Sequence, residues 1–382
     1  MSIRDTEWNL TRLIGERVRG LQEYAPEPLE EVAHRLGLPV GGLIKLDANE
    51  NPYGPTKHTL DILTGYAYAH RYPDPICRRL RQAIGEYLNV DPGCILVGNG
   101  SDELIDLTLR LFRPSPAGGG IGQVIDCPPT FGMYSFYGVT NDLEVIEIPR
   151  DQDFRVDVEG IVALCQRDPQ PKVLFLASPN NPDGQLLSDA ELARLLELPL
   201  LVVLDEAYIE FGDAAQNSRV GWVAERDNLI VLRTFSKWGG LAGLRVGYGV
   251  FPQTLMTALY RLKSPYNVNG LAQAAAQATL EDLPTAQANI HKIVAERERL
   301  RTKLQEISFL RIYPSQANFL LCRVQGMAVE TIRQAMEKRG IILRYFRPPL
   351  EDCIRITVGT PMQDEAVLMV FRALDKERQD GQ

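Results

Sequence analysis

The sequence has few cysteines and histidines, the residues that bind zinc or, in the case of cysteine, form disulfides. Its 382 residues include only six cysteines and four histidines, without a CxxC pair or a histidine cluster. Zinc or another bound metal is therefore not expected, and we interpret the cysteines as reduced thiols of a cytosolic protein. These residues are Cys77, Cys94, Cys127, Cys165, Cys322 and Cys353, and His34, His58, His70 and His291.

The sequence also lacks an apolar run long enough to cross a membrane, and its start, MSIRDTEWNL, is not a basic segment followed by an apolar one. We expect a cytoplasmic protein, or one in a compartment whose transit peptide is absent. An excess of positive charge is missing as well, because the formal net charge is -8 with both signs mixed along the chain. This balance argues against nucleic-acid binding, although a local cluster of arginines can still bind small anions.

The length of the chain exceeds that of one small core, so two domains are expected. Residues 1–44 predict a helical segment that packs with the smaller domain, residues 45–280 a large domain, and residues 281–382 a small C-terminal domain of alternating strands and helices. The first segment spaces four apolar residues for one helical face, namely Leu13, Ile14, Val18 and Leu21.

The most informative stretch is IVLRTFSKWGGLAGLRVGY, which begins at Ile230. A buried strand predicted over Leu229–Arg233 ends in a polar turn that contains Lys237, and the glycines that follow let other groups approach closely. Burial near a cation such as Arg245 lowers the pKa of a lysine, so Lys237 is a candidate Schiff-base amine. The alternative is that Lys237 caps a strand end and pairs with an acidic residue.

A second turn has the form of an anion site. Cys94–Val97 predicts a strand, GNG a tight turn, and Ser101–Phe112 an amphipathic helix. Backbone N–H groups and the positive end of the helix dipole suit a phosphate at such a turn. GNG alone is more often a structural turn.

Polar motifs follow two more predicted strands. SPNNPDG comes after Val173–Ala177, and DEAY comes after Leu198–Leu204. Function in parallel sheets collects at the carboxyl ends of strands, and a buried carboxylate such as Asp205 must be paired. Asp205 could instead be a helix N-cap, the Asn-Pro and Asp-Gly pairs predict turns in any case, and Phe131 in CPPTFGMY could be a core residue.

The segment SKxxxLAGLRxG resembles the lysine segment of fold-type I aminotransferases that depend on pyridoxal phosphate. The matching residues are Ser236, Lys237, Leu241, Ala242, Gly243, Leu244, Arg245 and Gly247. The resemblance implies an α/β fold, in which a large domain has a mostly parallel seven-stranded sheet flanked by helices and a smaller α/β domain follows. It also implies pyridoxal 5'-phosphate as cofactor, carried by Lys237.

The same resemblance implies further site residues. Asp205 would pair with the pyridinium nitrogen, Asn181 and Tyr208 would bind the phenolic oxygen, and Phe131 would stack on the ring. Tyr72 in RYPDP would reach the cofactor phosphate of a neighbouring subunit, which implies a homodimer. The phosphate would otherwise be held by Gly100, Ser101, Asp102, Ser236 and Arg245.

Motifs between Tyr24 and Thr360 resemble the histidinol-phosphate aminotransferase branch of this family. They are ANENPYGP, RYPDP, GNGSDE, PPTFGMY, SPNNPDG and TFSKxxxLAGLR. This implies transamination between L-histidinol phosphate and 2-oxoglutarate, with glutamate as product. Arg355, on a strand with period-2 alternation, and Arg344 would bind the substrate anions with Asn181 nearby, and Tyr24 is a weaker candidate for the substrate phosphate. Asp183, where many relatives have Thr, is a minor departure.

Other functions are compatible with nearly the same motifs. An aromatic amino-acid aminotransferase or a decarboxylase of the O-phosphothreonine type could share them, because fold does not settle chemistry. From another class, the chain could be a binding or regulatory protein without activity. The complete set of Asn181, Asp205, Tyr208 and Lys237 argues against that alternative.

Overall fold

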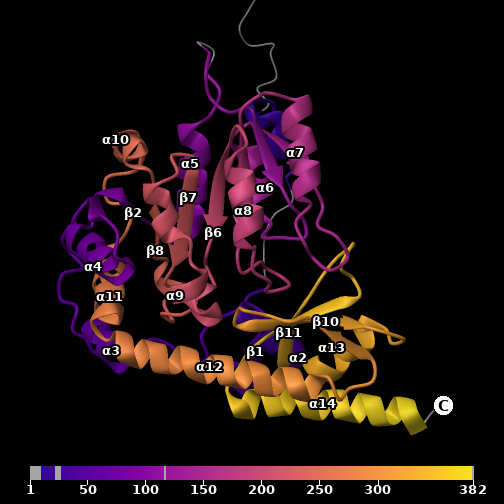
Figure 1. Ribbon diagram of the computed structural model, residues 1–382. Coiled ribbons are helices and arrows are strands. Elements are labelled where there is room, and N and C mark those ends of the chain that lie inside the picture. The colour runs from indigo at the N-terminus through magenta and orange to yellow at the C-terminus, as the bar shows by residue number, and fades with distance from the viewer. Residues whose placement is uncertain (1–9, 22–26, 116–117, 381–382) are drawn as a thin grey trace, which may run out of the picture.

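Two β-sheets organise the chain. A computed structural model describes residues 10–21, 27–115 and 118–380, and these residues form one sheet of seven strands and one of five. Figure 1 shows the larger sheet among helices in the upper part of the molecule and the smaller sheet below it. The long helices α12 (Leu283–Leu304) and α14 (Pro361–Asp380) run along the base.

The larger sheet has the predicted, mostly parallel arrangement. Only β8 runs against its neighbours β2 and β7, and the other pairs are parallel. Its middle strands are buried on both faces, which explains their unbroken apolar sequences. In spatial order the strands are β2 (Ile95–Gly98), β8 (Gly247–Val250), β7 (Leu229–Thr234), β6 (Leu200–Asp205), β5 (Lys172–Ala177), β3 (Gln123–Asp126) and β4 (Glu144–Glu147).

Alternate residues of the large sheet face two separate cores. On β5, Leu174 and Leu176 join the core on one face, while Val173 and Phe175 join the core on the other. The sheet is therefore held on both sides by apolar contacts. This rigid layer fixes the positions of the residues that follow β5, β6 and β7.

The smaller sheet combines strands from distant parts of the chain. Strand β1 pairs in parallel with β11, with Ile44 opposite Ile341, and the other pairs are antiparallel. In spatial order the strands are β1 (Ile44–Leu46), β11 (Ile341–Tyr345), β12 (Cys353–Thr357), β10 (Phe319–Val324) and β9 (Leu310–Ile312). The domain boundaries predicted after residues 44 and 280 stay predictions, since α12 contacts both the smaller sheet and the turn η4 (Ile209–Gly212).

Four α-helices begin at a residue whose side chain caps them. Thr56, Asp157, Ser188 and Asn269 accept hydrogen bonds from backbone N–H groups at the starts of α3 (Lys57–Thr64), α7 (Val158–Arg167), α8 (Asp189–Leu196) and α11 (Gly270–Glu281). Ser188 also forms a capping box with Glu191. The other helices are α1 (Glu16–Arg19), α2 (Leu29–Leu36), α4 (Arg78–Leu88), α5 (Gly100–Leu111), α6 (Met133–Thr140), α9 (Ala214–Asn217), α10 (Gln253–Leu262) and α13 (Val329–Glu337).

The N-terminal segment differs from its predicted amphipathic helix. Helix α1 is a single turn that lies against α6, and Arg17 Nη1 donates to the carbonyl oxygen of Leu143 at 2.7 Å. The apolar side chains of Leu13, Ile14 and Val18 are 71%, 43% and 51% exposed. So short a helix has no continuous face to bury.

No helix among the described residues is long and apolar enough to cross a membrane. Nor do these ranges contain a group of three or more His, Cys, Asp or Glu side chains that could hold a metal ion.

Candidate active site

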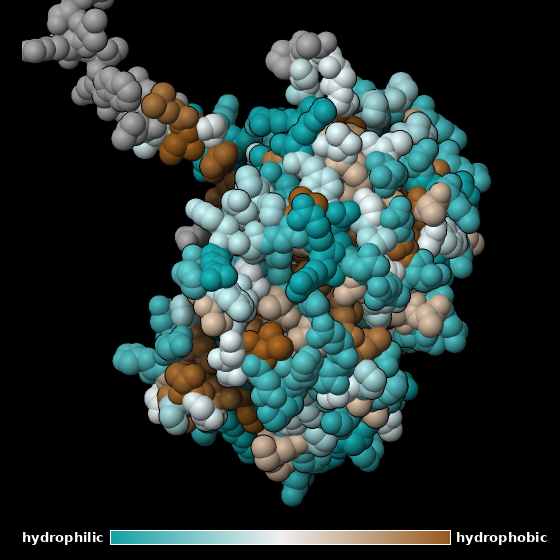
Figure 2. All heavy atoms as spheres, turned by 90° about the vertical axis from the view of Figure 1, so that its left-hand side faces the viewer, coloured by the Kyte–Doolittle hydropathy of each residue, from teal (hydrophilic) through white to brown (hydrophobic). Residues whose placement is uncertain are grey.

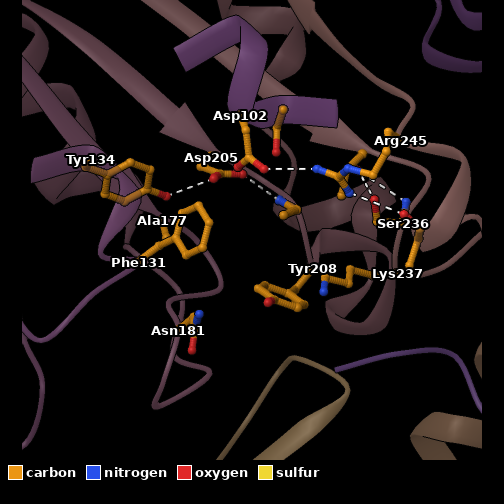
Figure 3. A pocket seen from close by; sticks show the side chains of 14 residues that line it. Asp102, Phe131, Tyr134, Ala177, Asn181, Asp205, Tyr208, Ser236, Lys237 and Arg245 are labelled. Carbon is orange, nitrogen blue, oxygen red and sulfur yellow. Dashed lines mark hydrogen bonds and ion pairs between the residues drawn. The ribbon is translucent and has the colours of Figure 1, made fainter. Parts of the chain in front are cut away.

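A cavity of about 130 Å³ opens at the carboxyl ends of β5, β6 and β7. Its walls come from the turns that follow these strands and from the start of α5 (Figure 3). The lining residues are Ser101, Asp102, Phe131, Tyr134, Ala177, Asn181, Asp205, Ala207, Tyr208, Thr234, Ser236, Lys237, Ala242 and Arg245. Most of the site residues predicted from the sequence are therefore brought together.

Lys237 lies in the turn after β7, and its ammonium group points into the cavity beside Tyr208 (Figure 3). Its Nζ donates to the carbonyl oxygen of Ala48 at 3.0 Å and lies 5.8 Å from the centre of the Tyr208 ring. Burial, and then the nearby guanidinium groups of Arg355 and Arg245, lower the pKa of Lys237 to about 8. A substantial neutral fraction near pH 7 to 8 makes this amine a nucleophile and a base.

Asp205 ends strand β6 with only 4% of its surface exposed. Its Oδ1 accepts from the backbone N–H of Ala207 at 3.0 Å, and its Oδ2 accepts from the hydroxyl of Tyr134 at 2.8 Å. Neither partner is cationic, and burial raises the pKa of Asp205 to about 6. A cationic ligand atom beside this carboxylate would offset the cost of its burial.

Tyr208 and Asn181 lie on the opposite side of the cavity from the start of α5, and each is held by a residue of another segment. The Tyr208 hydroxyl accepts from Nδ2 of Asn49 at 3.0 Å. Oδ1 of Asn181 accepts from Nη1 of Arg355 at 2.5 Å. Because Asn181 Oδ1 is engaged as an acceptor, its Nδ2 group and the Tyr208 hydroxyl proton are the donors that a ligand oxygen would meet.

The other end of the cavity is suited to an anion. The N-terminus of α5 meets Arg245 and Ser236 there, and Nη2 of Arg245 pairs with Oδ2 of Asp102 at 2.9 Å. Gly100 has φ +79°, and a Cβ at this position would lie 2.7 Å from Nη2 of Arg245. The positive φ favours glycine here, and the absence of a side chain leaves room for the guanidinium near the positive end of the helix.

Four predicted residues do not line the cavity. Gly100 and Arg355 lie beside it, because Gly100 begins α5 next to Arg245 and Arg355 donates to Asn181. Tyr72 is 82% exposed and stacks on Tyr266 with ring centres 4.5 Å apart. Arg344 lies on β11 directly opposite Arg355 of β12, with its guanidinium 5.9 Å from the centre of the Phe346 ring. Tyr24 lies outside the described residues.

Several polar residues at the cavity were not predicted from the sequence. Tyr134 is in the CPPTFGMY motif, three residues after Phe131, but nothing local predicts its bond to Asp205. Asn49 is in ANENPYGP, a motif whose dense polar residues are typical of a loop but do not indicate their partners. Thr234 ends β7 and donates to Oγ of Ser236 at 2.9 Å, a contact that the strand pattern alone does not reveal.

Comparison with known proteins gives a consistent result. Residues 42–373 match the family model of aminotransferase class I and II. The chain is 47% identical over 375 residues to histidinol-phosphate aminotransferase of Roseiflexus castenholzii, covering 95% of this chain and 98% of that protein. It is 44% identical over 357 residues to the chloroplastic histidinol-phosphate aminotransferase of Nicotiana tabacum, covering 92% and 84%.

Solved structures are similar as well. Histidinol-phosphate aminotransferase from Sinorhizobium meliloti, in complex with pyridoxal-5'-phosphate, superposes with a TM-score of 0.83 at 26% sequence identity. The match covers 94% of this chain and 98% of that chain.

Proposed function

Because the chain belongs to the class I and II aminotransferases, and within them to the histidinol-phosphate aminotransferase family, we propose that it transfers the amino group of L-histidinol phosphate to 2-oxoglutarate. The products are imidazole acetol phosphate and glutamate, a step of histidine biosynthesis, and the cofactor is pyridoxal 5'-phosphate. The observation that carries this proposal is one cavity that combines a lysine of lowered pKa, a buried carboxylate and an anion site.

The cavity residues fit the parts of this cofactor. Bound pyridoxal phosphate supplies an aldehyde that condenses with amines and a cationic ring that withdraws electrons from the reacting carbon. Lys237 would hold the aldehyde carbon, Asp205 the ring nitrogen, and Phe131 a face of the ring. The phosphate would be held by Gly100, Ser101, Asp102, Ser236 and Arg245.

Lys237 is the group we assign to proton transfer. Its amine would take the proton from the substrate carbon that bears the amino group and deliver it to the cofactor carbon that began as the aldehyde. A pKa of about 8 suits both directions, since the amine gives and accepts protons near neutral pH. Asp205 would keep the ring nitrogen cationic, while Tyr208 and Asn181 would donate to the phenolic oxygen.

Arg344 and Arg355 are our candidates for substrate binding. Directly opposite residues on antiparallel strands share a face of the sheet, and like charges there repel unless an anion lies between them. A guanidinium fork can bind either phosphate or carboxylate through two hydrogen bonds, so one pair could serve histidinol phosphate and 2-oxoglutarate in turn. Asn181, held by Arg355, would connect this pair to the cofactor, and Tyr24 stays a weaker candidate.

We also propose that the active form is a homodimer in which Tyr72 reaches the site of the partner subunit. Figure 2 looks onto the side that carries α3, α4 and α11, where apolar side chains lie among hydrophilic ones. Exposed apolar residues of the segments around these helices are Leu60, Tyr68, Tyr72 and Tyr266. A second copy packed on this side would cover them.

A cytoplasmic location is the last part of the proposal. All six cysteines are free thiols, and five of them are buried, as expected in a reducing compartment. Cell fractionation with an antibody to the protein would test it. Recovery in a membrane or secreted fraction would contradict it.

Single-turnover absorbance tests the reaction. Cofactor-loaded protein is mixed with L-histidinol phosphate, phenylalanine or O-phosphothreonine, and the formation of pyridoxamine phosphate is followed by its absorbance. We expect fast conversion to pyridoxamine phosphate with histidinol phosphate alone, and a rate roughly a thousandfold lower in Lys237→Ala. Conversion with phenylalanine instead would assign an aromatic aminotransferase, and release of carbon dioxide from O-phosphothreonine would assign a decarboxylase.

A further inference from the structure

Tyr134 is a buried tyrosine that the proposed reaction does not use. It lies on α6 with no exposed surface, and its ring stacks on Phe175 at 5.0 Å and meets Phe131 edge-on at 5.5 Å. These two rings fix the direction of the phenol. Its hydroxyl donates to Oδ2 of Asp205 at 2.8 Å, as Figure 3 shows.

The bond to Tyr134 completes the hydrogen bonding that the protein gives to Asp205. Oδ1 is held by the N–H of Ala207, and Oδ2 by the phenol. Each carboxylate oxygen can accept two hydrogen bonds, so a lone pair is left for a ligand atom. The two donors come from different segments, α6 and the turn after β6, and together they fix the plane of the carboxylate.

We propose that Tyr134 is a positioning residue that keeps Asp205 oriented and ionised for a cationic ring nitrogen. This inference rests on the proposed function, because it assumes that Asp205 meets the nitrogen of pyridoxal phosphate. A phenol that donates to a carboxylate stabilises the anion, and a buried anion without that donor would take up a proton more readily. A protonated Asp205 would no longer stabilise positive charge on the ring.

The alternative role of Tyr134 is to fill space in the core. Tyr134→Phe separates the two roles, because phenylalanine retains the ring that packs between Phe175 and Phe131. Only the hydroxyl and its bond to Asp205 are lost. A space-filling residue would affect every ligand of the cavity alike, whereas a residue that acts through Asp205 would affect only ligands with a ring nitrogen.

Equilibrium binding to the cofactor-free protein makes this distinction without measuring activity. Pyridoxal phosphate is compared with its 1-deaza analogue, in which a carbon replaces the ring nitrogen. We expect the wild type to prefer pyridoxal phosphate. In Tyr134→Phe we expect affinity for pyridoxal phosphate to fall roughly tenfold, as for the loss of a charge-assisted hydrogen bond, and affinity for the analogue to change less than about twofold.

Two further proteins serve as controls. Tyr260→Phe removes a hydroxyl that lies 3.5 Å from the carbonyl oxygen of Ile95, away from the cavity, and should leave both affinities unchanged. In an Asp205→Asn background, Tyr134→Phe should no longer alter the preference between the two ligands. An equal loss for both ligands in Tyr134→Phe would overturn the positioning role.

The binding experiment gives a different result if the proposed function is wrong than if only the role of Tyr134 is wrong. A wild type that binds both ligands equally well would show that Asp205 does not meet a ring nitrogen. If Tyr134→Phe does not fold, Phe175→Leu removes the ring that holds the phenol in place, and we expect the same loss of preference in smaller degree. An unchanged preference in that variant would also overturn the role of Tyr134.

Discussion

Lys237 is enclosed by the protein and lies near two guanidinium groups, and this environment has a measurable consequence. Its pKa is lowered to about 8, so its amine is neutral above that pH, whereas an ordinary lysine is neutral only above about 10.4. In cofactor-free protein we expect reductive methylation of Lys237, mapped by peptide mass, to rise with pH and reach half its limiting rate near pH 8. Arg355→Met removes one of the cations and should move that midpoint upward.

A midpoint near that of ordinary lysines, or one that does not respond to Arg355→Met, would contradict the assigned environment. The direction of the pKa shift depends on which form of the amine is destabilised. Burial and neighbouring cations both destabilise the ammonium form, so the neutral amine appears at lower pH.

At the scale of residues, the sequence predicted the cavity residues that lie near strand ends. It did not predict the residues that hydrogen-bond to them. Lys237, Asp205 and Asn181 could be found because each lies at the end of a buried apolar strand or in the turn that follows it. Tyr134 and Asn49 were missed because their hydrogen bonds join residues far apart in the chain. Such contacts depend on how distant segments pack, and short sequence patterns do not indicate that packing.

Among the elements, the loop Asp47–Asn51 connects the two sheets at the cavity. Its backbone carbonyl oxygens accept from Arg355 Nη2 at 2.6 Å and from Lys237 Nζ at 3.0 Å. Asn49 contacts both sides, since its Nδ2 donates to Tyr208 and its backbone N–H donates to Oγ1 of Thr357 at 3.0 Å. The loop thereby links the strand that carries Arg355 to the cofactor site.

Replacement of Asn49 tests this link. The residue is buried with φ +56°, a conformation that asparagine and glycine tolerate better than alanine. We expect Asn49→Ala to lower the free energy of unfolding by about 2 to 4 kcal/mol, from lost buried hydrogen bonds and backbone strain. Asn49→Gly removes only the bonds and should be less destabilising by about 1 kcal/mol. Urea unfolding of both variants measures the difference.

A loss no larger than about 0.5 kcal/mol in Asn49→Ala would show that the loop bears no such role. The same variants should lower kcat/KM roughly tenfold, because Tyr208 loses the donor that orients it. Equal stability of the alanine and glycine variants would remove the contribution assigned to backbone strain.

The sequence predicted the bounds of strands correctly where every residue of the strand is buried. The strands expected at Leu229–Arg233 and Val173–Ala177 agree with β7 and β5 to within one residue. The amphipathic pattern of residues 13 to 21 was misleading, because a helical period in the sequence does not supply a surface to pack against. The smaller sheet was recognised only as a region of alternating elements, since β1 finds its partner near the other end of the chain.

For the whole molecule, exchange of subunits tests the proposed dimer. Two heterodimers are purified with different tags. One combines Lys237→Ala with Tyr72→Ala chains, and the other combines a wild-type chain with a Lys237→Ala/Tyr72→Ala chain. If Tyr72 serves the partner's site, the first has one intact site of two and about half the wild-type activity, whereas the second has none.

The two heterodimers exchange their expected activities if Tyr72 serves its own subunit. That result would contradict a crossing tyrosine while leaving dimer formation intact. Sedimentation of the wild type as a monomer would contradict the dimer itself. Both oligomeric state and crossing contact are beyond the reach of one chain's sequence, because a surface tyrosine has the same local pattern whether or not a partner covers it.

The pairing of β1 with β11 sets an order for assembly during protein synthesis. All strands of the larger sheet lie between Ile95 and Val250, so they leave the ribosome before Ile341 has been added. Until then β1 has no neighbour in its sheet, and the loop that follows it lacks its contacts with Arg355 and Thr357. A nascent chain thus contains Lys237 well before Arg355, which helps to lower its pKa, and catalytic competence arrives only during the last third of translation.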